Sequence, residues 1–170
     1  MTMARKKDIP DLPAESAVDA AHTLVAIDRI VGFLLNGQRY ALPIGRVREI
    51  QQIVAFADVP SGSNGVVGMI NLRGHVIPAV DMHCLVGLEP LERTLATPMI
   101  IAETHDHLVA LLVDEVLDVF ELSPECLQEA PALHQLGMCM IGVARLDDGL
   151  VYILDPDRLI GAGMLEQGCA

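Results

Sequence analysis

Residues 68–87, GMINLRGHVIPAVDMHCLVG, have a counterpart further along the chain in residues 142–161, GVARLDDGLVYILDPDRLIG. The two segments align without a gap at a constant offset of 74, with apolar residues matched at nine of the twenty positions. Glycine opens and closes both segments, and an aspartate occupies the same place in each, at Asp81 and Asp155. Chance agreement among apolar residues does not explain glycine and aspartate at fixed spacing, so the alignment indicates an internal duplication.

A second pair of segments extends the duplication towards the N-terminus. ALPIGRVREI, residues 41–50, aligns with ALLVDEVLDV, residues 110–119, at an offset of 69. Two offsets in the same order predict a repeated unit of roughly 65 residues, with a five-residue difference in one connecting loop.

Each copy of the repeat has the pattern of short β-strands joined by tight turns. Asn36-Gly37 is a strong hairpin signal, since both residues tolerate a positive φ, and the turn at His105–His107 has the same place in the second copy. A further hairpin is predicted to turn at Arg73-Gly74, and its counterpart at Asp148-Gly149. No segment shows a long helical period, so we expect an all-β fold of two small barrels sharing a core.

Short helices are expected directly after the last strand of each copy. Asp81 and Asp155 are suited to N-capping them, and Pro156 suits the first position of the second helix. We expect the two helices to end near Gly87 and Gly161.

The predicted organisation is one folded domain over residues 28–163, between a flexible tail at 1–27 and a short tail at 164–170. Following the repeat, we expect two barrel lobes at about 28–93 and 94–163. The sequence shows no apolar run long enough to span a bilayer and no signal-peptide core, and its four cysteines have no CxxC spacing. These features favour a cytoplasmic protein.

Charge is distributed unevenly. The net charge is −12, yet residues 28–93 hold six arginines and six carboxylates, whereas residues 94–170 hold two arginines and thirteen carboxylates. Such a balance argues against binding nucleic acid or inserting into acidic membranes. It suits attachment to two different surfaces, although acidic residues also serve solubility alone.

Candidate catalytic and metal-binding groups are few. His105-x-His107 lacks a third ligand at a suitable spacing, and Asp81 of Asp81-x-His83 is better explained as a helix cap. A carboxylate cluster that could bind a hard cation is more typical of a solvated face: Asp114, Glu115, Asp118 and Glu121. No nucleophile, P-loop or zinc motif is present, so no catalytic residue, metal ligand or cofactor is assigned.

Arg73 and Glu49 leave two interpretations open from the residues alone. They could form a surface ion pair worth only about 0.2–1 kcal/mol. Alternatively, an arginine at a rigid hairpin tip is a suitable anchor for a partner, since its planar donors are directional.

Four segments in order, YALPIGRVREI, VVGMINLRGHVIPAVDMHCLVGL, LLVDEVLDVFEL and MIGVARLDDGLVYILDPDRLI, resemble the CheW-like chemotaxis coupling proteins. The resemblance covers Val31 to Ile160 and implies two pseudo-repeated, SH3-like five-stranded β-barrels with short connecting helices. It also implies a non-catalytic adaptor, without cofactor, that joins the cytoplasmic tips of methyl-accepting receptors to the regulatory domain of a CheA-type histidine kinase. Receptor-binding positions of the family fall on Ile44, Val47, Glu49, Gly68, Asn71, Arg73 and Gly74.

Other parts of the interpretation stay open at this point. The resemblance assigns no kinase-binding residues, because the loops that make that contact vary, and it does not specify a flagellar, pilus-based or other output. Two other functions are also considered: a small-ligand sensor that uses the cleft between the barrels, and a metal-assisted enzyme built on His105, His107 and the acidic face.

Overall fold

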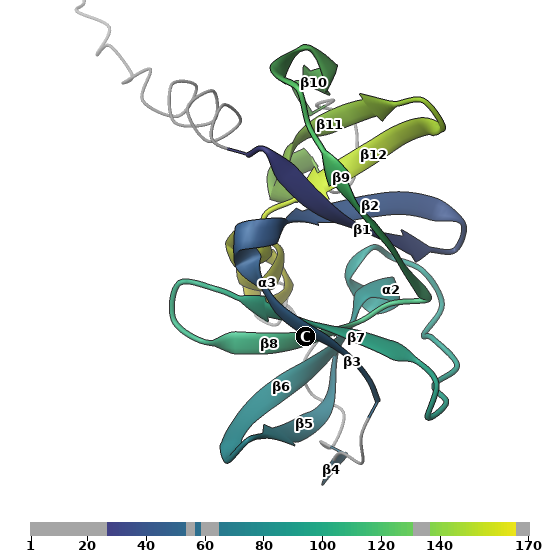
Figure 1. The fold of residues 1–170 in the computed structure, drawn as a ribbon. Coiled ribbons are helices and arrows are strands. Elements are labelled where there is room, and N and C mark those ends of the chain that lie inside the picture. The colour runs from purple at the N-terminus through teal and green to yellow at the C-terminus, as the bar shows by residue number, and fades with distance from the viewer. Residues whose placement is uncertain (1–26, 54–56, 59–64, 131–136, 166–170) are drawn as a thin grey trace, which may run out of the picture.

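Twelve strands form two six-stranded sheets in the computed structural model, which describes residues 27–53, 57–58, 65–130 and 137–165. Figure 1 shows the sheets one above the other. The upper sheet contains β1 (Arg29–Leu35), β2 (Gln38–Pro43), β9 (Glu115–Glu121), β10 (Leu127–Gln128), β11 (Met140–Leu146) and β12 (Gly149–Leu154). The lower sheet contains β3 (Val47–Gln52), β4 (Ala57–Asp58), β5 (Val66–Leu72), β6 (His75–Asp81), β7 (Pro98–Glu103) and β8 (Leu108–Leu112).

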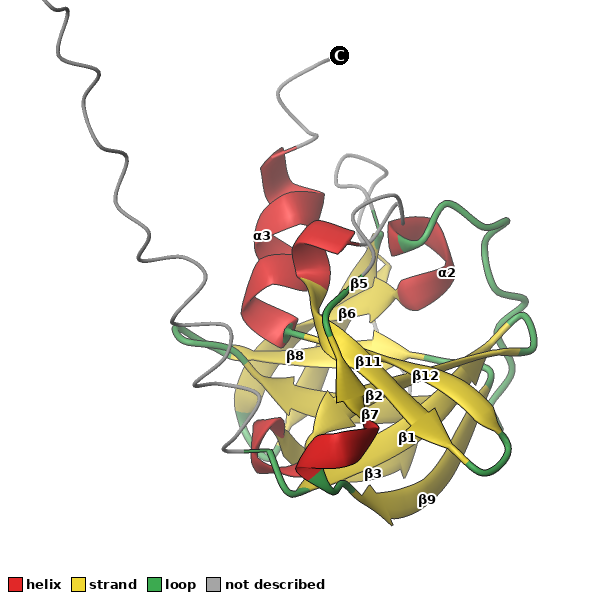
Figure 2. Ribbon diagram, turned by 90° about the horizontal axis from the view of Figure 1, so that it is seen from above, coloured by secondary structure: helices red, strands yellow, loops and turns green. Residues whose placement is uncertain are grey.

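Short helices complete the fold at the level where the sheets meet. Figure 2 shows α2 (Met82–Leu85) and α3 (Pro156–Leu165) on the same side of the sheets. The 3₁₀ turns are η1 (Ile44–Arg46), η2 (Pro124–Cys126) and η3 (Gly137–Cys139). Among the described residues, no helix combines the length and apolar character needed to cross a bilayer.

The two sheets have equivalent strand orders, as expected from the internal repeat. The upper sheet runs β10-β11-β12-β2-β1-β9 and the lower sheet runs β4-β5-β6-β8-β7-β3, so each strand has a counterpart in the other sheet. The single parallel pairing in each sheet, β12 with β2 and β6 with β8, falls at the same place. The all-β class with two pseudo-repeated halves is therefore confirmed. Each sheet has six strands in the described chain, where five were expected, because the two-residue strands β4 and β10 extend one edge.

The sheets do not coincide with the halves of the sequence. The first hairpin of each copy, β1–β2 or β7–β8, lies in the sheet formed by the other copy. The expected lobes at about 28–93 and 94–163 therefore do not coincide with the two sheets. We call each sheet with its connecting turns a lobe. The exchange places Glu103 and Asp106, which belong to the acidic half of the sequence, in the lower lobe. Charge is therefore less segregated in space than in sequence.

Burial on both faces explains why these hairpins occupy the centre. Phe33 on β1 and Ile100 on β7 face a core shared by the two sheets, whereas Ile30 faces the core of the upper sheet and Ile101 that of the lower sheet. Their strands consequently have near-continuous apolar sequences rather than an alternating pattern. A single copy of the repeat, without the other, would leave one of these faces in contact with water, at about 25 cal/mol per Å² of apolar surface.

Most predicted turns and caps are confirmed. Asn36 and Gly37 have φ values of 48° and 78°, as a tight hairpin turn requires. Asp81 caps α2, with its carboxylate accepting from the His83 N–H at 2.9 Å. In the second copy the turn lies one residue earlier than predicted, at 147–148, because Leu146 pairs with Gly149 and the positive φ of 126° belongs to Gly149 itself.

The first helix ends near Gly87 as expected, and the second continues beyond the expected glycine. Helix α2 stops at Leu85 and Gly87 follows with a φ of 76°, while α3 continues past Gly161 to Leu165. Gly161 has no left-handed φ, and a glycine within a helix weakens it by only about 0.5–1 kcal/mol without ending it.

Candidate functional site

The tip of the β5–β6 hairpin holds Arg73 in an uncommon conformation. Arg73 and Gly74 have φ values of 50° and 89°, and the Asn71 Oδ1 accepts from the Gly74 N–H at 2.8 Å. A left-handed φ is unfavourable for a side chain as large as arginine, by about 1–2 kcal/mol. The turn would form more readily with asparagine or glycine at this position. The arginine side chain, 80% exposed, is thus held outward at a local conformational cost.

Glu49 on edge strand β3 meets that arginine. The Arg73 Nη2 lies 2.8 Å from the Glu49 Oε2, although 24 residues separate them in sequence, so the two side chains pair with each other. Glu49 is only 24% exposed and also accepts from the Gln51 side chain. Beside this pair, Arg48 contacts Glu103 at 2.7 Å. A bulge between Val47 and Glu49 interrupts the regular pairing of β3 with β7 at this point.

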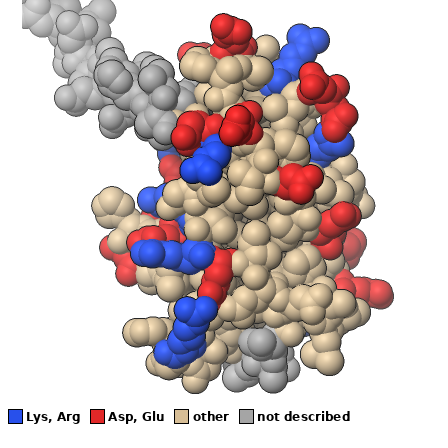
Figure 3. All heavy atoms as spheres, in the orientation of Figure 1, with Lys and Arg blue, Asp and Glu red and all other residues tan. Residues whose placement is uncertain are grey.

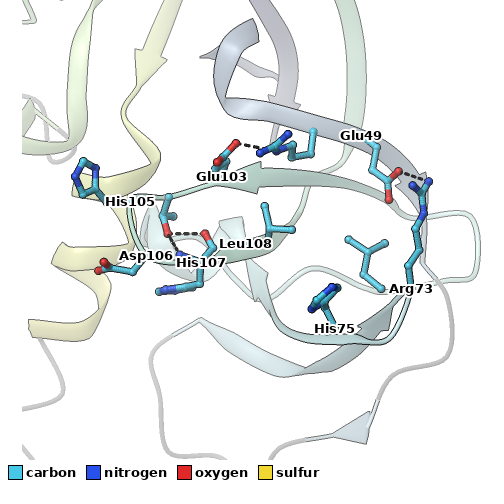
Figure 4. Close-up of a pocket in the computed structure, with 11 residues that line it drawn as sticks. Glu49, Arg73, His75, Glu103, His105, Asp106, His107 and Leu108 are labelled. Atoms are coloured by element: carbon cyan, nitrogen blue, oxygen red, sulfur yellow. Dashed lines mark hydrogen bonds and ion pairs between the residues drawn. The ribbon is translucent and has the colours of Figure 1, made fainter.

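A hollow of about 530 Å³ opens next to the Arg73–Glu49 pair. Figure 4 shows Glu49 and Arg73 at one end, His105 and Asp106 at the other, and Leu108 and His75 between them. Figure 3 shows basic and acidic side chains alternating over the lower half of this face, near β3 and the β5–β6 hairpin. The hollow is therefore lined by residues of both charge signs around a small apolar floor.

The other predicted site residues lie apart from this hollow. Val47 is half-buried against the shared core, and Gly68 is buried within β5 opposite Ala79. Ile44, on η1, lines a second hollow of about 410 Å³. The structure thus brings Glu49, Asn71, Arg73 and Gly74 together and places Ile44 in a different hollow. The lining of that second hollow comprises Ile27, Asp28, Arg29, Pro43, Ile44, Gly45, Arg46, Ile141, Asp155, Pro156 and Asp157.

The candidate metal and acid–base groups have structural partners. Thr104 closes the β7–β8 turn through bonds with His107, and the His105 N–H donates to Asp157 at 2.5 Å. Asp81, almost fully buried, accepts from both the His83 and Leu91 N–H groups. Across the described ranges, no three His, Cys, Asp or Glu side chains are grouped so that they could hold a metal ion.

Two cysteines, Cys84 and Cys139, lie in environments that favour the neutral thiol. Burial raises the pKa of Cys139, and nearby Asp155 raises it further. Burial likewise raises the pKa of Cys84, and the Asp81 carboxylate adds to the effect through its charge and a hydrogen bond. Since the thiolate is the reactive form, neither residue has the environment of a nucleophile.

Sequence reasoning missed a set of exposed apolar side chains. Ile50 on β3 and Val76 on β6 are exposed in the lower lobe, while Val119 on β9 and Leu150 on β12 are exposed in the upper lobe. The repeat offsets relate Ile50 to Val119 and Val76 to Leu150. The alternation along each strand could have identified them, because all four occupy positions facing away from the cores.

Comparison with known proteins relates this geometry to a family. The model of the CheW-like domain matches residues 29–163. A chemotaxis protein CheW of Bacillus subtilis is 32% identical over 135 residues, covering 78% of this chain and 86% of the relative. A probable chemotaxis protein CheW of Rhizobium etli is 31% identical over 132 residues, covering 76% and 85%.

A solved structure shows the same architecture. The crystal structure of the scaffolding protein TtCheW from Thermoanaerobacter tengcongensis superposes with a TM-score of 0.72 at 27% identity, covering 78% of this chain and 91% of that one. The chain belongs to the CheW-like family, as the resemblance of its sequence indicated. It has the fold of a chemotaxis scaffold.

Proposed function

We propose that the protein is a non-catalytic adaptor that couples methyl-accepting chemotaxis receptors to a CheA-type histidine kinase. Membership of the CheW-like family supports the general role. The observation that carries the receptor-binding part is Arg73, an exposed arginine held in a strained turn and oriented by Glu49. A residue with an unfavourable backbone conformation and an outward side chain is typical of a functional position.

The proposed receptor surface follows the lower sheet from the β5–β6 tip along β3 towards η1. Arg73, Glu49 and Asn71 provide polar groups at one end, and Ile44 provides an apolar contact at the other. A helical hairpin could lay a mixed polar and apolar stripe across such a surface. The remaining predicted positions act by support: Gly74 completes the turn, Gly68 lies inside β5, and Val47 anchors β3 to the core.

The kinase is proposed to bind elsewhere, so that both partners attach at once. Val119 on β9 and Leu150 on β12 are exposed apolar residues of the upper sheet, and each is close in sequence to an acidic residue, Asp118 or Asp148. A surface of this kind, apolar with an acidic rim, suits a partner with complementary basic groups. We place the protein in the cytoplasm, where it joins receptor arrays at the membrane.

The first experiment compares the wild type with Arg73→Glu in titrations against a receptor-tip fragment and against the kinase regulatory domain. We expect the variant to lose receptor affinity by more than about tenfold, or 1.4 kcal/mol, because the reversed charge faces both Glu49 and the partner. We expect kinase affinity to stay unchanged and the melting temperature to fall by no more than about 4 °C, because the lost surface ion pair is worth only about 0.2–1 kcal/mol.

Arg145→Glu is the matched control, since Arg145 is an exposed arginine on β11 of the upper sheet. An equal loss of receptor affinity in this control would mean that total charge, not the Arg73 site, governs binding. If the wild type binds neither partner, the sensor alternative gains support from the 410 Å³ hollow beside Ile44, and metabolites should then raise the melting temperature.

A further inference from the structure

The charged residues that line the hollow beside Arg73 differ in whether their charges are already paired. Arg48 and Glu103 pair with each other at 2.7 Å, and Glu49 is engaged by Arg73. The Asp106 carboxylate is exposed, and it makes no hydrogen bond or ion pair with any residue that the structure describes. Asp106 therefore presents an uncompensated negative charge to a partner.

Arg73 is the second lining residue with unused capacity for hydrogen bonds. Its Nη2 lies 2.8 Å from the Glu49 Oε2, and a guanidinium has five N–H donors. Within the described chain, the other donors have no acceptor. The arginine is 80% exposed and Glu49 only 24%, so the outward side of this pair is basic.

These two groups of opposite charge lie at opposite ends of the hollow. Figure 4 shows Arg73 at one end and Asp106 at the other, with Leu108 and His75 between them. Leu108 and Leu72 line the hollow and are half-buried against the core of the lower sheet, so their exposed parts form an apolar floor. The surface thus passes from a basic end, over an apolar floor, to an acidic end.

Hydrogen bonds to the backbone hold both ends in place. At the basic end, the Asn71 side chain accepts from the Gly74 N–H at 2.8 Å. At the acidic end, Thr104 closes the β7–β8 turn with its hydroxyl and its N–H, and the His105 N–H donates to Asp157 at 2.5 Å. Charged groups on such fixed turns lose less conformational freedom on binding than charged groups on mobile loops.

A partner that covers the hollow has to satisfy both charges. Removing a carboxylate from water without supplying a donor costs free energy, and an arginine left without an acceptor carries the same kind of cost. A wholly apolar helix, or a helix with a basic residue facing Arg73, is therefore disfavoured. The two ends together select the partner and its direction.

We propose that the hollow receives one helix of the receptor tip in a single direction, with an acidic side chain at Arg73 and a basic side chain at Asp106. Apolar residues on the same face of that helix lie on Leu72 and Leu108, at the spacings of three, four or seven residues that share a helix face. The inference rests on the proposed receptor-binding function, because the hollow is continuous with Arg73 and Glu49. It adds Asp106 as a second anchor and specifies the charge pattern of the partner.

The first test titrates a receptor-tip fragment against the full-length wild type, Asp106→Arg and the control Glu125→Arg. Glu125 is an exposed acid on η2 of the upper lobe, outside the hollow, so the control makes the same change of charge. We expect Asp106→Arg to lose at least about tenfold in receptor affinity and Glu125→Arg to stay within about twofold of the wild type. Asp106→Asn, which suits a turn and only removes the charge, should lose affinity to a smaller extent.

Exchange of charge across the interface tests the direction of the helix. Each basic residue of the fragment is replaced in turn by glutamate, and each acidic residue by arginine. We expect one basic-to-glutamate replacement to restore binding of Asp106→Arg, and one acidic-to-arginine replacement to restore binding of Arg73→Glu, with both positions on one face of the same helix. Rescue by positions on different helices, or rescue of neither variant, would overturn the inference.

The outcomes separate this inference from the proposed function. If Arg73→Glu loses the receptor and Asp106→Arg does not, the adaptor role stands and the oriented helix is wrong. If Asp106→Arg loses the kinase regulatory domain instead of the receptor, the acidic end of the hollow belongs to the kinase, and the inference is again overturned. A wild type that binds no receptor fragment would overturn both.

Discussion

Arg73 combines an unfavourable backbone with an outward side chain, and the two properties can be separated experimentally. Its φ of 50° suits asparagine better than arginine, while its ion pair with Glu49 is exposed on the arginine side and contributes only about 0.2–1 kcal/mol. The residue therefore adds little to the stability of the turn. Under the proposed function, its value lies in what the guanidinium presents to a partner.

Arg73→Asn tests this separation. We expect its free energy of unfolding, measured by urea denaturation, to match that of the wild type within about 1 kcal/mol, because relief of the strained turn offsets the lost ion pair. Receptor affinity should fall as in Arg73→Glu. A variant that loses well over 1 kcal/mol of stability would show instead that the arginine is mainly structural.

At the scale of elements, the pairing of β1 with edge strand β9 depends on close packing at a glycine. A Cβ on Gly32 would lie 2.7 Å from the Phe120 Cε2 and 3.3 Å from the Leu117 Cβ, at a bulge between Val31 and Phe33. Real side chains do not approach so closely, and Phe120 packs against the core of the upper sheet. The absence of a side chain at Gly32 thus leaves room for Phe120 where β9 pairs with β1.

We predict that Gly32→Ala destabilises the protein by about 1–3 kcal/mol, because the added methyl group forces Phe120 or the strand to shift. Urea denaturation measures the effect. Gly45→Ala is the control, because a Cβ there meets nothing within 4 Å and the residue has no positive φ. Equal stability of the two variants would indicate that Phe120 swings away at little cost.

Some of these elements could be predicted from the sequence and others could not. Local signals were sufficient for the Asn36-Gly37 turn, the Asp81 cap and the pairing of β5 with β6, since each depends on neighbouring residues. The Asp148-Gly149 turn was misplaced by one residue because either pair is compatible with a tight turn. The contact of Glu49 with Arg73 depends on how β3 lies relative to the β5–β6 hairpin, which no local pattern encodes.

At the scale of the whole molecule, the exchanged hairpins tie the two lobes into one folding unit. The apolar runs of β1 and β7 indicated burial on both faces, but no sequence pattern indicated that each hairpin would join the other copy's sheet. The core shared by the two sheets contains Phe33 and Leu111, which come from opposite halves of the chain. Neither half can bury its hairpin alone.

We therefore predict that fragments 27–93 and 94–165 are each unfolded in isolation and that mixing them restores the β-rich circular dichroism spectrum. The exposed segment 92–96 is the natural place for the cut, since a break between residues 93 and 94 leaves every strand intact. Size-exclusion chromatography of the mixture should show a one-to-one complex. A fragment that folds alone with a cooperative transition would contradict this dependence.

The exchange of hairpins also bears on the origin of the fold. A chain with one copy of the repeat would carry a hairpin that its own sheet does not use and a place for a hairpin that it does not supply. Two such chains would satisfy each other as a symmetric dimer, and duplication of the gene with fusion of the copies would make the arrangement permanent. Once joined, the copies were free to diverge: His83, which contacts Asp114, has as its counterpart the acid Asp157, which pairs with Arg46.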